Sequence, residues 1–376
     1  MPLFGPPNVS TLLAKKDFAG LIKALGYAND QGQTRQAAAK ALIQLGSLAL
    51  PALRKALNDP NPAIRTGVCF SLQEIGNPTT LPDLLQTLSD DSNAVRQAAQ
   101  QSIEHICSHF TPNPLLKLLS TDPPHLAEKA AIALGNMKDT KSLPLLIEML
   151  DSPNHHQRMA ATHALEKMGN TTIPALSDAI QHRSEDARRS AAQLLGKTAD
   201  PNAIPGLLTA LDDPSEYVFL EVANALASFG TPAALPLLRL FLIGTPETRP
   251  RAGKALQKLG AAAEPAFRTA LQRGDSESQQ RVASLLGGIE QPWVAPLLIE
   301  QLRSSDEALR YAALQSLGQQ STPIFIPVFL KALNDPSPYV QDCAAHWLQT
   351  LQPNIQDPLQ QRQVAQALQT HQRSIS

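Results

Sequence analysis

Residues 142–169 read SLPLLIEMLDSPNHHQRMAATHALEKMG, and this stretch contains the pattern that decides the fold. A short Leu-rich segment begins at a proline, a polar loop follows, and an Ala-rich segment opens near Arg158 and closes at Gly169. Apolar residues at i, i+3, i+4 and i+7 predict one amphipathic helix in each segment. Proline suits the first turn of a helix because it lacks an amide hydrogen, and glycine suits the residue after the last turn. The stretch is therefore predicted to be a helical hairpin.

The hairpin recurs along the whole chain. A proline in the same register returns every 29 to 32 residues, at Pro51, Pro82, Pro114, Pro144, Pro174, Pro205, Pro236, Pro265, Pro296, Pro327 and Pro358. Such a period is typical of a solenoid, in which each unit packs on the next and one continuous core replaces separate domains. We predict an all-α, right-handed α-solenoid of about 11 helical-hairpin repeats.

The predicted solenoid is a single domain over residues 1–376, with helical caps at both ends. Residues 8–27 contain KKDFAGLIKALGY without an entry proline and are predicted to form an N-terminal helical cap. Residues 28–352 hold the repeats. Residues 353–376 contain the Gln-rich DPLQQRQVAQALQTHQ and are predicted to form a C-terminal helical cap and tail. Polar caps are what a solenoid requires at its two ends.

Charge and cysteine content limit the classes of partner and compartment. The net charge is −1, from 32 basic and 33 acidic residues, which argues against nucleic acid or an anionic membrane as the main partner. Cys69, Cys107 and Cys343 lie far apart and fit the reduced thiols of a cytoplasmic protein. The chain contains no apolar run of about 18 residues, and its start is broken by prolines, so neither a transmembrane helix nor a signal peptide is expected.

Arginine marks the start of most Ala-rich segments. The register positions are Arg35, Arg65, Arg96, Ala127, Arg158, Arg188, Phe219, Arg249, Gln279, Arg310 and Gln341. An Asp stands six residues before the Arg in two complete pairs, Asp59 with Arg65 and Asp90 with Arg96. These segments resemble the short HEAT-like repeat of the phycobilisome-lyase-type HEAT repeat proteins, whose pattern is similar to V-R-x-A-A-x-A-L-G-x-I-G.

The resemblance implies a structural ladder in which such Asp and Arg pairs tie one repeat to the next. Asp213 and Asp335 match only half of the pair, because Phe219 and Gln341 replace the Arg. TPR and ankyrin arrays are the competing solenoids. They are less favoured, since their periods are 34 and 33 residues and neither signature occurs in the chain.

The resemblance also implies that the second helix of each hairpin lines a concave face. Positions +1 and +5 from the register residue point away from the core stripe and are mostly polar. The apolar exceptions are predicted to bind a partner protein, unless they tuck under an adjacent repeat: Phe70, Ile132, Met159, Leu220 and Tyr311. Tyr217 and Phe219, at the entry to one second helix, are further candidate contacts and are expected to be exposed.

Histidine and cysteine clusters invite a metal-site interpretation, which the spacing does not favour. His105, Cys107 and His109 have zinc-like spacing, but Cys107 is expected to point away and the sequence offers no fourth ligand. His155, His156 and His163 fail in the same way. HEAT-like enzymes that resemble deoxyhypusine hydroxylase carry His-Glu dipeptides as iron ligands, and this chain has no such dipeptide. We expect no metal, no cofactor and no catalytic residue.

Two basic clusters are interpreted as solvated faces. One comprises Arg183, Arg188 and Arg189, with Glu185 and Asp186 among them. The other lies within residues 249–258. Neither predicts a nucleic-acid site in a chain of near-zero net charge.

The sequence thus predicts a non-catalytic scaffold or adaptor that engages another protein on the concave face. The resemblance implies one alternative, a bilin lyase-type or phycobilisome-turnover factor that acts on phycobiliproteins. That alternative predicts an apolar pocket near Met159 and Leu220 in which Arg189 or Lys254 pairs with bilin propionates.

Overall fold

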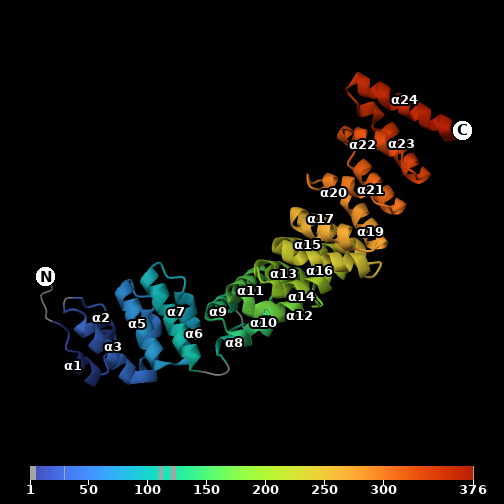
Figure 1. The fold of residues 1–376 in the computed structure, drawn as a ribbon. Coiled ribbons are helices and arrows are strands. Elements are labelled where there is room, and N and C mark those ends of the chain that lie inside the picture. Colours follow the sequence, from blue (N-terminus) through green and yellow to red (C-terminus); the bar gives the residue numbers. More distant parts are fainter. Residues whose placement is uncertain (1–5, 29, 110–112, 120–123, 376) are drawn as a thin grey trace. The chain divides into compact units, whose positions relative to one another are not determined.

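Every regular element in the described part of the chain is helical. The computed structural model describes residues 6–28, 30–109, 113–119 and 124–375, and within these ranges it contains α-helices and short 3-10 helices but no strand (Figure 1). The predicted all-α class is confirmed. The chain falls into two units, Met1–Ser190 and Ala191–Ser376, and each is described by itself.

The first unit begins with a pair of short helices and continues as helical hairpins. Its elements are α1 (Val9–Ala14), α2 (Phe18–Leu25), α3 (Gln33–Leu45), η1 (Gly46–Ala49), α4 (Leu50–Ala56), α5 (Pro62–Ile75), η2 (Pro78–Thr80), α6 (Leu81–Thr87), α7 (Asn93–Ser108), α8 (Leu115–Leu118), α9 (Pro124–Met137), η3 (Thr140–Ser142), α10 (Leu143–Met149), α11 (His155–Met168), η4 (Gly169–Thr172), α12 (Ile173–Ala179) and the start of α13 (Glu185–Lys197).

The second unit repeats the same alternation and ends in a long helix. After the last residues of α13 its elements are η5 (Pro201–Ala203), α14 (Ile204–Thr209), η6 (Ala210–Asp212), α15 (Glu216–Phe229), α16 (Thr231–Ile243), α17 (Thr248–Leu259), η7 (Gly260–Ala263), α18 (Glu264–Arg273), α19 (Ser276–Leu286), α20 (Val294–Gln301), α21 (Glu307–Gln319), η8 (Pro323–Phe325), α22 (Ile326–Ala332), α23 (Pro338–Leu351), η9 (Gln352–Asn354) and α24 (Pro358–Ile375).

Proline fixes the start of most first helices. Pro82, Pro144 and Pro174 lie in the first turns of α6, α10 and α12, where a missing amide hydrogen leaves no helical bond unmade. The expectation is wrong for Pro236, which lies inside α16 because that helix already begins at Thr231. A short 3-10 turn usually precedes the proline. Among the elements that the structure describes, only the repeat of α16 has α-helix in place of this turn.

The predicted caps of the second helices are present. The Asn61 and Asn154 side chains accept hydrogen bonds from the amides of Ala63 and His156, each at 2.9 Å, and begin α5 and α11. Gly169 ends α11 with φ of +62°, a conformation that a residue with a Cβ rarely adopts. The loop residues therefore set the length of each second helix.

Small residues let neighbouring second helices approach closely. A Cβ added to Gly135 in α9 would lie 2.5 Å from the Cα of Ala164 in α11, so only glycine fits there. A Cβ on Gly318 in α21 would lie 2.1 Å from the ring of Trp347 in α23. The core of each unit is an Ala- and Leu-rich layer between such helices, with Leu72 and Leu195 fully buried.

Candidate functional site

In each unit the second helices present an exposed face, and we call the two faces together the second-helix face. It consists of positions +1 and +5 from each register residue, and every one of these side chains is exposed or half-exposed. The prediction that these positions point away from the core is confirmed, because the helical period places them opposite the buried stripe.

Four large apolar side chains stand on this face. Met159 is 56% exposed, Phe70 48%, Leu220 43% and Tyr311 42%. They come from α11, α5, α15 and α21, two in each unit. Ile132, the fifth candidate, is half-exposed. None of the four tucks fully under an adjacent repeat, so the alternative of complete burial does not apply to them.

Of the two aromatic candidates at the entry of α15, one is exposed and one is not. Tyr217 is exposed, whereas Phe219 is only 2% exposed, and the expectation that Phe219 is exposed is wrong. The Arg251 guanidinium lies 5.3 Å from the Phe219 ring centroid, and the Lys254 ammonium lies 5.7 Å from it. Arg251 Nη1 also donates to the carbonyl oxygen of Asp213 at 2.5 Å. Phe219 is therefore a packing residue covered by two cations.

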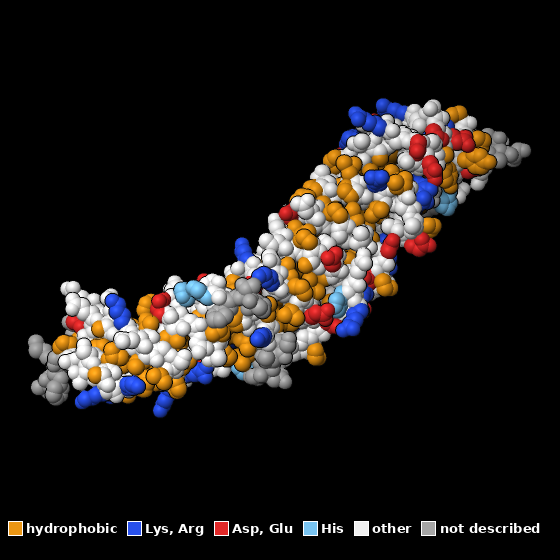
Figure 2. Space-filling model, turned by 90° about the horizontal axis from the view of Figure 1, so that it is seen from below, with side chains coloured by type: hydrophobic (Ala, Val, Ile, Leu, Met, Phe, Trp, Pro, Cys, Tyr) orange, Lys and Arg blue, Asp and Glu red, His pale blue; other side chains and the backbone are white. Residues whose placement is uncertain are grey.

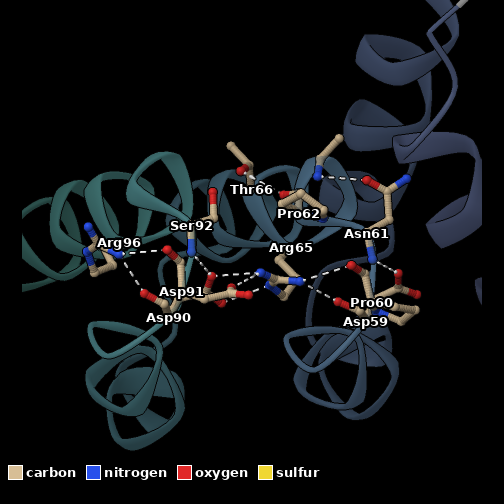
Figure 3. Close-up of polar contacts among 11 residues, drawn as sticks. Asp59, Pro60, Asn61, Pro62, Arg65, Thr66, Asp90, Asp91, Ser92 and Arg96 are labelled. Atoms are coloured by element: carbon tan, nitrogen blue, oxygen red, sulfur yellow. Dashed lines mark hydrogen bonds and ion pairs between the residues drawn. The ribbon is translucent and has the colours of Figure 1, made fainter.

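Arg65 and Arg310 join the loop of their own repeat to the next repeat. Arg65 Nη1 donates to the carbonyl oxygen of Asp59 at 2.8 Å (Figure 3). Its Nε and Nη2 donate to the two carboxylate oxygens of Asp90 at 2.8 and 2.7 Å, and Nη2 also meets Asp91 at 2.7 Å. The hydrogen bonds from Arg65 lower the pKa of the Asp90 carboxyl, and those from Asp90 raise the pKa of Arg65.

The ladder that the resemblance implied pairs different residues. The sequence pattern paired Arg65 with Asp59, whereas in the structure the carboxylate that Arg65 binds belongs to Asp90. Within a repeat the Arg contacts a backbone carbonyl, as Arg96 does at Asp90 over 2.7 Å, and the carboxylate partner lies 25 residues later. Asp335 is such a partner, because Arg310 Nε and Nη2 donate to it at 2.9 and 2.8 Å. Gln341 replaces an Arg but still donates to the Asp335 carbonyl at 2.6 Å. Asp335 and Arg310 therefore form a complete rung of the ladder, although the sequence pattern matched Asp335 only in part.

The cysteines and histidines do not converge. The Cys107 side chain is buried, and burial raises the pKa of its thiol to about 12, so it is protonated at neutral pH. The rings of His105 and His109 lie at the helix end with their centroids 4.5 Å apart and their planes tilted by 46°. His109 Nδ1 lies 2.7 Å from the carbonyl oxygen of His105. Within the described ranges no three His, Cys, Asp or Glu side chains come together as a metal would require.

Charges of both signs are interspersed on the surface. Arg189 pairs with Asp186 at 3.2 Å, and Lys254 lies 3.9 Å from Glu216. On the face that Figure 2 shows, Lys and Arg side chains and Asp and Glu side chains are both present. None of the helices that the structure describes is long and apolar enough to cross a membrane.

One groove of about 590 Å³ opens on the second-helix face of the first unit. Helices α3, α5 and α7 or their first turns line it, Phe70 forms one side, and Arg35 lies among its lining residues. Sequence reasoning predicted Phe70 but missed Arg35. The available signal was the spacing, because the Asp of the next repeat, Asp59, stands 24 residues after Arg35, whereas Asp90 stands 25 residues after Arg65.

Serial helical hairpins with an Arg to Asp ladder define an α-solenoid. The family model for HEAT repeats matches residues 18–104, 112–193, 173–257 and 295–374, and the chain belongs to this family. The predicted resemblance to HEAT-like repeats is confirmed. No curated protein matches the chain.

Several solved structures are similar to the chain at low identity. The karyopherin Kap121p bound to the extreme C-terminus of the protein phosphatase Cdc14p is 15% identical, with a TM-score of 0.39 over 90% of this chain and 46% of that one. This chain thus spans about half the length of Kap121p. Human deoxyhypusine hydroxylase is 16% identical, with a TM-score of 0.26 over 92% of this chain and 100% of that one. The complex of CpcE and CpcF of phycocyanin lyase from Nostoc sp. PCC7120 is 23% identical, with a TM-score of 0.26 over 70% of this chain and 95% of that one. These similarities are too low to assign an activity.

Proposed function

We propose that the chain is a non-catalytic adaptor that binds a partner protein through its second-helix face. The observation that carries this proposal is the exposure of Phe70, Met159, Leu220 and Tyr311 on a face whose other positions are mostly polar. Large apolar side chains exposed on a polar surface are the usual anchors of protein interfaces.

The arrangement of these anchors suits an extended partner. They lie on separate second helices, and each is surrounded by polar neighbours such as Gln97, His163 and Asn224 at equivalent positions. Such a surface combines apolar contacts with a polar rim, which is how interfaces are built. Apolar anchors spread along the repeats are suited to binding another protein, whereas an enzyme site needs a few convergent groups in one pocket.

The alternative of a bilin lyase-type factor makes a different demand on the same residues. It requires a free cation beside Met159 or Leu220 to pair with a propionate. Arg189 already pairs with Asp186, and Lys254 lies near Glu216 and over Phe219, which supports the adaptor over the lyase. The test is to mix a bilin with the chain and record its visible absorbance spectrum. A spectrum that changes with the wild type but not with Lys254→Ala or Arg189→Ala would favour the lyase-type factor over the adaptor.

The adaptor proposal is tested by affinity capture from a lysate of the source organism. The bait is the wild type, a variant with Phe70, Met159, Leu220 and Tyr311 changed to Ala, or a matched control variant. The control removes four exposed apolar side chains that lie off the second-helix face, two in each unit: Leu48, Leu145, Leu235 and Ile324.

The expected result is a protein that the wild type and the control variant capture and the second-helix variant does not. Thermal melts by circular dichroism should be alike for all three chains, because all eight changed side chains are at least partly exposed. Equal capture by all three chains would refute the adaptor proposal.

A further inference from the structure

Arg35 differs from Arg65, Arg96 and Arg158, which occupy the same register position in their repeats. Arg65, Arg96 and Arg158 each donate Nη1 to the carbonyl oxygen six residues earlier, at 2.8, 2.7 and 2.7 Å. Arg35 has no side-chain hydrogen bond or ion pair to any residue that the structure describes, and its Nε is buried without an acceptor. Asp59 stands where Asp90 stands in the next repeat, six residues before the register Arg, but within the described residues it forms no bond with Arg35. A buried donor without a partner is costly and is satisfied by any acceptor that reaches it.

The side chain of Arg35 lies in the groove between α3, α5 and α7, which we call the Arg35 groove. Ala39, Ala63 and Ala94 line it and leave room because their side chains are small, and Phe70 forms an exposed apolar side. Arg35 is the one charged residue among its lining residues. The volume of the Arg35 groove, about 590 Å³, lies within the range that holds a ligand the size of a few side chains.

The charges around the groove favour an anion. Lys40, at position +5 of α3, is exposed and forms no ion pair within the described residues. Positions +1 and +5 of α3, α5 and α7 include no Asp or Glu. A carboxylate in the groove therefore meets Arg35 with no Asp or Glu among the lining residues. A guanidinium binds a carboxylate through two parallel hydrogen bonds.

We propose that the Arg35 groove binds an acidic peptide segment of the partner protein. A large apolar side chain of the segment packs against Phe70 and the alanines, and an adjacent Asp or Glu pairs with Arg35. This inference rests on the proposed adaptor function and specifies the chemistry of the partner.

A similar arginine in the second unit provides a contrast. Arg249 occupies the same register position, and its Nε likewise has no acceptor. Its groove of about 580 Å³ is also lined by Arg281 and by Glu277, an exposed carboxylate that bonds to Arg281. An acidic segment would meet a like charge there, so Arg249 is a matched control for Arg35.

The test selects peptides from a phage-displayed library of random dodecapeptides on the full wild-type chain. Selected clones are then assayed on Arg35→Gln, Phe70→Ala and the control Arg249→Gln. We expect clones that carry Asp or Glu next to Leu, Ile, Phe or Met, with affinity at least about tenfold weaker for the first two variants and unchanged for the control, since a charge-assisted hydrogen bond and an apolar anchor each contribute that much. Arg35→Lys should retain part of the affinity for the acidic clones.

Three results would overturn the inference. They are no enrichment on the wild type over Arg35→Gln, selected clones that are basic or uncharged, and acidic clones that bind Arg35→Gln as tightly as the wild type. Circular dichroism melts of Arg35→Gln should match the wild type, because the Arg35 side chain forms no hydrogen bond or ion pair with a described residue. In the lysate capture, a partner retained by Arg35→Gln but lost by the second-helix variant would overturn this inference and leave the adaptor function standing. A partner retained by both would overturn the adaptor function itself.

Discussion

Replacing Asp90 with Ala tests whether the carboxylate 25 residues after Arg65 holds adjacent repeats together. The change removes the acceptors of two hydrogen bonds from Arg65 and of one from the amide of Ser92, at 2.8, 2.7 and 2.9 Å. It leaves a guanidinium that is only 10% exposed with fewer partners. Breaking a buried ion pair costs about 3–5 kcal/mol. Asp91 remains at 2.7 Å from the same nitrogen and is 92% exposed, so we expect a smaller loss of about 2–3 kcal/mol.

The assay is urea unfolding followed by circular dichroism, with hydrogen exchange to locate the loss. Asp59→Ala is the matched control. Within the part of the chain that the structure describes, the Asp59 carboxylate accepts only the amide of Asn61, so its removal should cost within about 1 kcal/mol. Exchange should accelerate in α5 and α7, since solenoid repeats depend on their neighbours. A loss for Asp90→Ala equal to that for Asp59→Ala would refute the ladder.

The same ion pair gives a pH dependence of known sign. The hydrogen bonds from Arg65 lower the pKa of Asp90 in the folded chain below its unfolded value of about 3.9. The pair therefore contributes its full stability above about pH 4 and loses it as the pH falls through the folded-state pKa. Stability measured against pH should fall less steeply below pH 4 in Asp90→Asn than in the wild type. Equal slopes would contradict this reasoning.

Three further predictions concern packing and reactivity. Gly318→Ala should destabilise the second unit by about 1–3 kcal/mol in urea unfolding, because its Cβ would overlap the Trp347 ring; an unchanged midpoint would contradict that packing. Leu195→Ala removes a fully buried side chain and should cost about 2–5 kcal/mol, with hydrogen exchange accelerating around α13 and not in α23; uniform acceleration along the chain would contradict nearest-neighbour energetics. The thiol of Cys69, whose pKa burial raises to about 12, should react with a disulfide reagent at pH 8 only after unfolding is induced, and rapid reaction of the folded chain would contradict its burial.

The fold was predictable because the sequence marks both ends of each helix. Proline at the first turn, Asn or Ser at the N-cap and glycine after the last turn recur with one period, and these are local preferences of the backbone. Gly169, with its positive φ, occupies the place that the pattern assigned to it. Pro236 was misplaced because Thr231 and the residues after it continue the helix upstream of the proline, which a register count alone does not show.

The sequence predicts which side chains of the candidate site are exposed, but not the contacts that they make with neighbouring repeats. Helical periodicity places Phe70 and Tyr311 on the outside without any knowledge of their neighbours. The burial of Phe219 depends on Arg251, which reaches across from α17, and such a contact between repeats leaves no local mark in the sequence. The sequence pattern paired each Asp with the Arg six residues later, whereas the Asp90 carboxylate meets Arg65, 25 residues earlier, and spacing alone does not show which Arg the carboxylate reaches.

Hydroxyl-radical footprinting with a captured partner tests the adaptor account most directly, because it reads the exposure of individual side chains. Phe70, Met159, Leu220 and Tyr311 are exposed in the free chain, as are Leu48 and Ile324, which lie off the second-helix face. The account predicts that the partner reduces oxidation of residues in the first group and leaves Leu48 and Ile324 unchanged. Unchanged oxidation of the first group, with protection of Leu48 or Ile324 instead, would contradict it.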